Sequence, residues 1–416
     1  MKFYMGIWKG AKLPMRFEVN RLTMLEVAKS VAKVAPSNSH VSELNGILVE
    51  GNEDTGEVFL TATNYEVSIQ QKVFASVGES GSMLINARLL VDMMSKLEGE
   101  IVTLSADRPE ILKVSGGRCI YQIKCLPSKS YPKPVMPFPE ESVIMTGICS
   151  LAKRTTFLVS TDESKPLALR CVQIKLKNNA VHAAASDGNR MMMIKESTDP
   201  TAEREFMLPG KSLQMLASIS KDDDVFEVGD LGNEVVFVRG DMIFTIRKLA
   251  TGDFMDTNAI IKSLKPVYSA VADVGKMKEA LNIISIGALA SETRVPTNLV
   301  LSNGEIVLRC NGDKSEAATA LPANITHETP ETGFFYDASA LLKLFQVVGG
   351  KVKLDIDARG FMLVKTRNEA YFQSPVRPPV TKEPNTDKSG SQSEQGHNKQ
   401  QKRAKGAKNV KKEVAA

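Results

Sequence analysis

The chain is poor in the residues and motifs that usually signal chemistry. Its 416 residues include one tryptophan, four histidines and five cysteines. The histidines show no metal-ligand spacing. The cysteines form no CxxC pair, so we expect reduced, mostly buried thiols. No P-loop, GxGxxG, GxSxG or HExxH motif occurs. These absences argue against an enzyme or a metalloprotein, and we predict no catalytic residue, no metal and no cofactor.

Long apolar runs are also missing. No segment of about 18 consecutive apolar residues occurs, so we expect no membrane span. Residues 1–14 lack the apolar stretch of a signal peptide, which predicts a cytoplasmic location. What is present is the composition of a soluble globular protein, with 43% hydrophobic and 24% charged residues. The length suffices for two to four domains.

The net charge of +5 lies entirely at the end of the chain. From Pro378 onward there are nine Lys/Arg and four Asp/Glu residues, so the preceding body is neutral. This segment has no aromatic residue and is rich in Lys, Gln and Ser, which predicts a disordered basic tail over 378–416. Its KQQKRAKGAKNVKK cluster is equally typical of nonspecific phosphate binding and of a solubilising tail.

The body repeats the same pattern three times. Leucines of three similar segments recur at spacings of 123 and 128 residues, at Leu90, Leu213 and Leu341. Aromatic residues of three later segments recur at spacings of 123 and 127 residues, at Tyr121, Phe244 and Tyr371. Two independent markers with nearly the same period predict three copies of one domain-sized unit.

Each copy contains two halves with the same order of a strand, a helix and three more strands. In the first half, MRFEV alternates like a strand, and residues 21–35 have apolar side chains at helical spacing. Short strands with turn residues between them follow. Over the whole body the patterns predict six helices and about 24 strands. This is an α+β fold of three similar domains, with helices packed on one face of antiparallel sheets.

Domain boundaries are expected where proline and glycine collect. The segments YPKPVMPFPE (131–140) and DTNAIIKSLKPV (256–267) have the composition of linkers. We therefore predict domains at 15–135, 136–262 and 263–377.

The predicted helices are rich in basic side chains. Lys29 and Lys33 are four residues apart and share a helix face. Because the body is neutral, its acids must lie elsewhere, and such segregated charge favours a surface that contacts the phosphate backbone of a polyanion without reading its sequence. The alternative is that Lys and Arg are only good helix formers on solvated faces. The candidate residues for facing the polyanion are Arg21, Lys29, Lys33, Arg88, Lys96, Lys153, Arg154, Lys211 and Lys276.

One polar cluster stands out, the SDGNR stretch at 186–190. Its chemistry predicts a hairpin turn, in which Asp187 and Gly188 reverse the chain between two apolar strands.

Several segments together resemble the bacterial DNA polymerase III beta subunit, the sliding clamp. In chain order they are LTATNYEVSI, INARLL, SGGRCIYQIKCLPSKSYP, FLVSTDESKPL, AASDGNRM, IRKLATGDFMD and EAYFQSPVR. The resemblance covers residues 15–377 and implies a head-to-tail homodimer that closes into a ring of six domains. Helices would line the hole and sheets form the outside. Such a ring encircles double-stranded DNA independently of sequence and tethers the replicative polymerase for processivity.

The resemblance also implies a pocket between the second and third domains. There the replicative polymerase and the clamp loader insert short linear peptide motifs. The positions that match are Ala168, Ser186, Gly188, Asn189, Arg190, Met191, Met255, Ile260, Phe372, Ser374, Pro375 and Val376. The family usually has His at position 189, Leu at 191, Pro at 255 and Met-Pro-Met at 374–376. The sequence therefore predicts a remodelled pocket, in which residues 191–193 form either an adaptable apolar groove or ordinary core.

The dimer interface and the chain ends follow from the same resemblance. Arg88 matches the arginine with which the family begins its second helix. Residues 1–14 fall outside the resemblance and are expected to be an extension or an upstream start, with Met15 as the alternative first residue. The implied dimer contacts are Arg118, Tyr121, Ile123, Ala288 and Leu289.

Two alternatives to a replicative clamp remain at this point. One is a clamp-like paralogue, for example from a mobile element, that forms the ring but serves other partners through its altered pocket. The other is an enzyme on a repeated α+β scaffold.

Overall fold

The computed structural model describes most of the body. The described residues are 15–108, 110–126, 128–198, 202–249, 254–287, 295–311 and 316–378. The predicted extension at 1–14, the predicted tail after residue 378, and Ala288 and Leu289 lie outside them. No helix within these ranges is long and apolar enough to cross a membrane.

The predicted order of strand, helix and three strands recurs six times. The first domain contains β1 (Met15–Asn20), α1 (Arg21–Ala32), β2 (Gly46–Asn52), β3 (Glu57–Thr63), β4 (Val67–Phe74), β5 (Ser76–Glu79), β6 (Gly81–Asn86), α2 (Ala87–Lys96), β7 (Ile101–Arg108), β8 (Ile111–Gly116) and β9 (Cys119–Lys124). The second contains β10 (Val143–Thr146), α3 (Ile148–Thr155), β11 (Cys171–Lys177), β12 (Ala180–Ser186), β13 (Arg190–Ser197), β14 (Arg204–Pro209), α4 (Gly210–Ser218), β15 (Val225–Asp230), β16 (Glu234–Arg239), β17 (Met242–Arg247) and α5 (Thr257–Ser263).

The third domain closes the described part of the chain. It contains β18 (Pro266–Asp273), α6 (Val274–Gly287), β19 (Pro296–Ser302), β20 (Glu305–Asn311), β21 (Glu316–Pro322), β22 (Asn324–His327), β23 (Phe334–Asp337), α7 (Ala338–Val347), β24 (Lys351–Asp357), β25 (Met362–Lys365) and β26 (Glu369–Gln373).

Three elements add to the prediction. The short strands β5 and β22 were not expected, and the segment predicted as a plain linker at 256–267 contains the helix α5. This helix forms because the side chain of Asp256 accepts a hydrogen bond from the backbone N–H of Ala259 (3.0 Å) and so caps its first turn.

Most of the repeated helices begin at an Asn or Asp that ends the preceding strand. The side-chain oxygens of Asn20, Asn86, Asp273 and Asp337 each accept a hydrogen bond from a backbone N–H two or three residues further on, at 3.0–3.1 Å. Since the first N–H groups of a helix lack partners within it, this one residue type fixes the strand-to-helix corner in each case.

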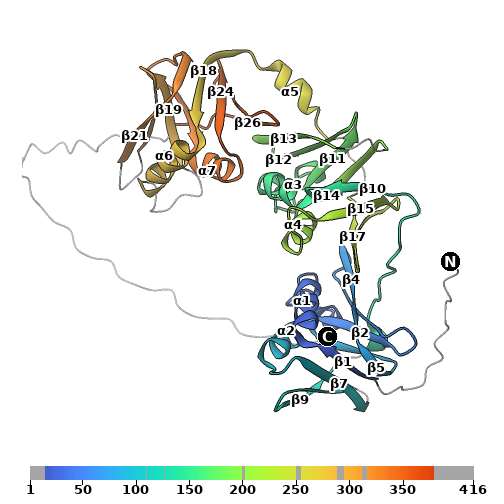
Figure 1. Ribbon diagram of the computed structural model, residues 1–416. Coiled ribbons are helices and arrows are strands. Elements are labelled where there is room, and N and C mark those ends of the chain that lie inside the picture. Colours follow the sequence, from blue (N-terminus) through green and yellow to red (C-terminus); the bar gives the residue numbers. More distant parts are fainter. Residues whose placement is uncertain are drawn as a thin grey trace, which may run out of the picture. The chain divides into compact units, whose positions relative to one another are not determined.

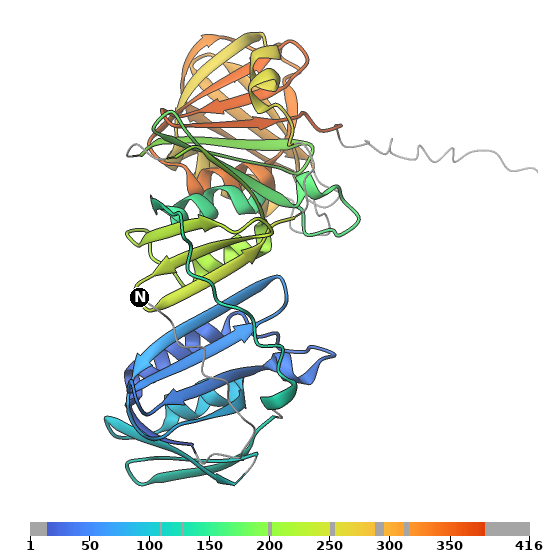
Figure 2. The ribbon, with the colours of Figure 1, turned by 90° about the vertical axis from the view of Figure 1, so that its right-hand side faces the viewer.

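The strands form four antiparallel sheets, two of which cross domain boundaries. β17 of the second domain pairs with β4 of the first, giving the eight-stranded order β10-β15-β16-β17-β4-β3-β2-β6. β26 of the third domain pairs with β13 of the second, giving the nine-stranded order β14-β11-β12-β13-β26-β25-β24-β18-β22. The other sheets are β5-β1-β7-β8-β9 and β21-β20-β19-β23. In Figure 1, α1, α2, α3 and α4 lie on the same side of the eight-stranded sheet, and in Figure 2 the helices of the first domain lie behind their strands.

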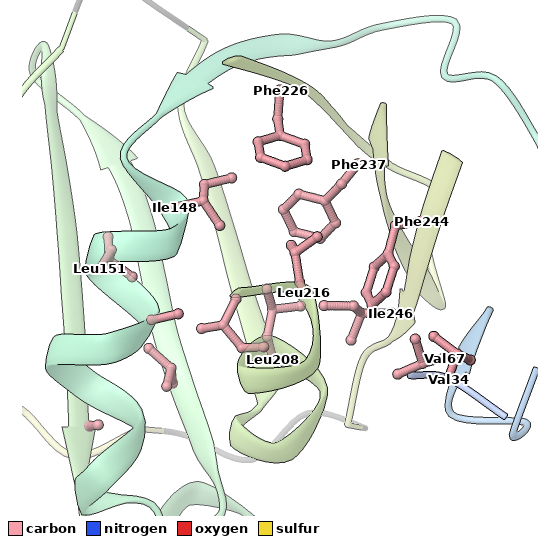
Figure 3. Close-up of a cluster of buried hydrophobic side chains, with 14 of the residues drawn as sticks. Val34, Val67, Ile148, Leu151, Leu208, Leu216, Phe226, Phe237, Phe244 and Ile246 are labelled. Carbon is pink, nitrogen blue, oxygen red and sulfur yellow. The ribbon is translucent and has the colours of Figure 1, made fainter. Parts of the chain in front are cut away.

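The hydrophobic core continues through these junctions. In the second domain, Phe226 and Phe237 meet edge to face at 6.2 Å between ring centroids. Figure 3 shows this cluster extending past Phe244 and Ile246 to Val67 of the first domain. All five residues are at most 1% exposed, so the sheet that joins the two domains has the same buried character as a domain interior.

The thiols are as predicted for the described residues. All five cysteines are free, and four of them are buried. Burial raises the pKa of the Cys125 and Cys171 thiols to about 11, which keeps them protonated and unreactive near neutral pH.

Candidate functional site

The exposed helix faces carry most of the basic residues predicted to contact DNA. Arg88 and Lys153 are exposed but lie close to acids, Asp92 at 3.8 Å and Asp222 at 3.3 Å. Surface pairs of this kind contribute little and exchange readily for other anions. The exposed members of the predicted set are Lys29, Lys33, Arg88, Lys96, Lys153, Lys211 and Lys276.

Two other members of that set have structural roles. Arg21 is half-buried, and its guanidinium donates to the backbone carbonyls of Gly99 (3.0 Å) and Met94 (3.2 Å) near the end of α2. Arg154 donates to Glu196 (2.5 Å) and Glu369 (2.7 Å), and its side chain is 14% exposed. Glu369 belongs to the third domain, so Arg154 is part of the junction between domains rather than of an open basic surface. The proposed DNA-facing set omits both residues.

The SDGNR stretch forms the predicted hairpin turn between β12 and β13. One carboxylate oxygen of Asp187 accepts the backbone N–H groups of Asn189 (2.9 Å) and Arg190 (2.8 Å), and the other pairs with the Arg190 guanidinium at 2.5 Å. The Ser186 hydroxyl donates to the Arg190 carbonyl (2.7 Å) and accepts the N–H of Gly188 (3.1 Å). Gly188 has φ +93°, a conformation that favours glycine.

The C-terminal segment is attached to this turn. The backbone N–H of Ser374 donates to the Asn189 carbonyl (3.0 Å), and the N–H of Val376 donates to the Phe335 carbonyl (2.8 Å). Ala168 lies in a short 3-10 helix, η4 (Leu167–Leu169), and a side chain of this helix approaches Gly188. The structure thus brings together part of the predicted pocket set, the residues near 168, 186–190 and 374–376, from three distant stretches of sequence.

Beside the turn, side chains of adjacent strands form an apolar row on the sheet face away from the helices. Met191 pairs with Phe372, which pairs with Leu363. The ring of Phe361 stacks on Phe372 with centroids 5.5 Å apart, and the Arg359 guanidinium lies 4.7 Å from the Phe361 ring. The sequence did not reveal Phe361 or Leu363 as members, because only strand pairing shows that they adjoin Phe372.

The predicted methionine groove is realised in part. Met191 is 2% exposed and Met192 belongs to the core, whereas Met193 is half-buried. Met193 and Met255 both line a groove of about 780 Å³ on the same face. Ile260 lies in α5, close in sequence to Met255 and half-buried.

The predicted interface residues of the first domain lie on β9 or just before it. Tyr121 and Ile123 are half-buried against the core, and Arg118 is exposed in the preceding turn. Among the described strands, β9 and β21 each pair on one side only and end their sheets.

The sequence matches two parts of one protein family. Residues 15–137 match the model of the DNA polymerase III beta subunit N-terminal domain, and residues 145–256 match that of its central domain. The chain belongs to the DNA polymerase III beta subunit family. The beta sliding clamp of Chlamydia trachomatis is 25% identical over 328 residues, which cover 77% of this chain and 76% of the relative. That of Staphylococcus aureus strain Mu50 is 24% identical over 317 residues, covering 73% and 82%.

Solved structures agree with this fold. The chain resembles the DNA polymerase sliding clamp of Bacillus subtilis with a TM-score of 0.79 and 20% identity, over 88% of this chain and all of that one. The DnaN sliding clamp of Pseudomonas aeruginosa, solved with griselimycin, gives 0.78 and 20% with the same coverage. The members of the DNA polymerase III beta subunit family are sliding clamps, which act as processivity factors. The chain is therefore a clamp and not an enzyme. The alternatives of an enzyme or a clamp-like paralogue are not favoured.

Proposed function

We propose that two copies of this chain close head to tail into a ring that encircles duplex DNA and tethers the replicative polymerase. One observation carries the proposal. Phe244 on β17 and Tyr371 on β26 lie on strands that pair with a strand of the neighbouring domain, and they are buried at 0% and 1% exposure. Tyr121, their counterpart in the repeat, is only half-buried, because β9 ends its sheet. The repeat therefore leaves β9 as a sheet edge that a further domain would cover.

The two internal junctions follow one rule. In each, the last strand of a second half-domain pairs antiparallel with the last strand of a first half-domain. At the first junction Phe244 lies opposite Ile69, and at the second Tyr371 lies opposite Met192. β9 is the last strand of a second half-domain and β21 is the last strand of a first half-domain. Among the described strands, neither pairs with a strand of another domain. Two identical β9–β21 contacts between two copies would close the ring.

The rule also predicts the register of this seam. Within their hairpins, Ile69 of β4 and Met192 of β13 each belong to the second residue pair counted from the turn. Ala317 occupies the same position in the hairpin that ends with β21. Tyr121 of one copy then lies opposite Ala317 of the other. Because antiparallel strands run in opposite directions, Cys119 lies opposite Thr319.

A single substitution tests this seam. Directly opposed residues of an antiparallel pair have Cα atoms about 4.5–5.5 Å apart, within the range of about 4.4–6.8 Å that a disulfide spans. We expect Thr319→Cys to form a covalent dimer with the native Cys119 under mild oxidation, seen on a non-reducing gel.

Two variants serve as controls for the cross-link. Thr319→Cys combined with Cys119→Ser should give no cross-link, and neither should Ala318→Cys, whose side chain points to the other face. A dimer in sedimentation that does not cross-link would reject the register. A monomer at all concentrations would reject the ring.

The helix face supports the DNA part of the proposal. Its exposed lysines and arginines are spread over α1, α2, α3, α4 and α6. Each is a long, flexible cation that can contact phosphate oxygens without reading bases. Many weak contacts of this kind suit a ring that slides.

The pocket beside the SDGNR turn supports the partner part of the proposal. A partner peptide would place apolar side chains against Phe372, Phe361 and Met255, with Ile260 and the 374–376 segment at its borders. Polymerase and clamp loader would share this site through short linear motifs.

We expect Met255→Asp to weaken binding of a labelled peptide from the replicative polymerase. Removing water from an unpartnered polar group costs about 1–3 kcal/mol and from a carboxylate more, so we expect the affinity to fall at least about fivefold. Met255→Leu, which keeps an apolar side chain of similar volume, should bind nearly as well as the native protein. Unchanged affinity of the aspartate variant in fluorescence anisotropy would reject the site.

A further inference from the structure

The groove that Met255 lines has an apolar floor. It lies on the face of the nine-stranded sheet opposite α3, where residues of α5 also line it, and has a volume of about 780 Å³. Ala184, Met193 and Ala370 are neighbours across three strands and form part of its floor. Phe254 and Met255 line it from the segment before α5. The groove therefore adjoins the proposed partner pocket and shares one residue with it.

Beyond the apolar floor, the groove is lined by a row of basic side chains. Lys175, His182 and Lys195 lie opposite one another on β11, β12 and β13, two residues along the strands from the apolar floor. Lys177, Lys365 and Arg367 also line the groove. The lining thus holds five Lys or Arg residues.

Among the described residues that line the same groove, two carry carboxylates, and both have other roles. Asp256 caps α5 through the backbone N–H of Ala259. Glu369 accepts a hydrogen bond from Arg154 at 2.7 Å. Lys365 is paired with Asp355 at 3.3 Å, so the excess of positive charge along the described lining comes from the other four Lys and Arg residues.

Several of these bases are available to a ligand. Lys175 and Lys177 pair with acids at the rim, Glu205 at 3.3 Å and Glu203 at 3.9 Å, and these exposed pairs are weak. Lys195 and Arg367 are exposed, and no carboxylate within the described ranges lies in ion-pair distance of either. The pKa of His182 is lowered, first by burial and then by the charges of Lys195 and Lys175. This is the effect expected of a positive potential.

The distance between the partner pocket and the basic row corresponds to a short stretch of extended peptide. Met191, in the apolar row beside the turn, and Lys195 are four residues apart on β13. At about 3.3 Å per residue this is about 13 Å, which an extended peptide crosses in about four residues.

We propose that this groove binds acidic residues that flank the apolar anchor of the partner peptide, about four residues away from it. The proposal rests on the proposed function of the neighbouring pocket. The groove would add affinity for partners with an acidic flank and leave others unaffected, so it would rank the partners that compete for one clamp. The chain's own segment from Pro378 onward carries nine bases and four acids and does not complement the groove. Duplex DNA is expected on the opposite, helix-bearing face.

A matched set of peptides tests the proposal. The probe is the labelled polymerase peptide, extended at either end by a four-residue Gly-Ser spacer and then by three glutamates or three glutamines. We expect the glutamate extension at one of the two ends to bind about tenfold more tightly than its glutamine twin at low salt. This gain should disappear with Lys195→Gln combined with Arg367→Gln. It should persist with Lys351→Gln combined with Arg309→Gln, which removes the same charge elsewhere on the third domain.

The outcomes separate the two proposals. If the unextended peptide does not bind the native protein, the partner pocket itself is rejected. If it binds, but the glutamate and glutamine peptides are equal at both ends, only the groove is rejected. A loss of affinity for a short DNA duplex in the Lys195 and Arg367 variant, without any effect on the glutamate peptides, would assign the groove to DNA and also overturn the proposal.

Discussion

Once oxidised around a nicked circular plasmid, the Thr319→Cys dimer is expected to remain on the DNA at high salt. A protein held by about six phosphate contacts loses on the order of 10³ in affinity between about 50 and 200 mM salt. A covalently closed ring on a circle has no dissociation route, whatever the salt concentration. Gel filtration at the higher salt should therefore recover the dimer with the plasmid.

A single cut in the plasmid provides the contrast. After linearisation the closed ring slides off the ends, so the same high-salt column should separate protein from DNA. A reducing agent should release the dimer from uncut circles as well. The matched control is Thr319→Cys combined with Cys119→Ser, which cannot form the disulfide, so its seams can still open and it should be lost from both forms at high salt. Equal retention on circles and linear DNA would contradict encirclement.

Arg154→Met is expected to loosen the junction between the second and third domains. The arginine is the only cation paired with Glu196 and Glu369 within the described residues. Its removal leaves both carboxylates without their cation, and one of them is largely buried, since the Glu369 side chain is 11% exposed and that of Glu196 is 35% exposed. Removing one partner from a buried ion pair costs about 3–5 kcal/mol. We expect hydrogen exchange of the β13 and β26 amides to accelerate on the order of a hundredfold or more.

The neighbouring residue supplies the control. Lys153→Met removes the same charge from the same helix, but its side chain is exposed, so exchange at β13 and β26 should not change. The β17–β4 junction should stay protected in both variants, because it lies in a different sheet. A double variant, Arg154→Met with Glu369→Leu, should recover part of the protection if the uncompensated carboxylate is the cause. Unchanged exchange in Arg154→Met would show that the ion pairs do not hold the junction.

Arg154 also shows where prediction from the sequence ends. Helical spacing placed it beside Lys153 among the DNA-facing residues. Its two partners lie 42 and 215 residues further along the chain, and no local pattern reveals them. Phe361 and Leu363 escaped prediction for the same reason, since they adjoin Phe372 only through the pairing of β25 with β26.

The sequence by itself determined the repeated plan of this clamp. Local hydrophobic periodicity and turn residues act over a few residues, so strand, helix and turn could be predicted six times over, including the SDGNR hairpin. The tertiary structure decided which side chains meet. Strand pairing across the domain boundaries joined Met191 to Phe372, bound Arg154 into a junction and placed Lys175, His182 and Lys195 in one row. Those contacts link residues distant in sequence, and only the packing of whole domains sets their register.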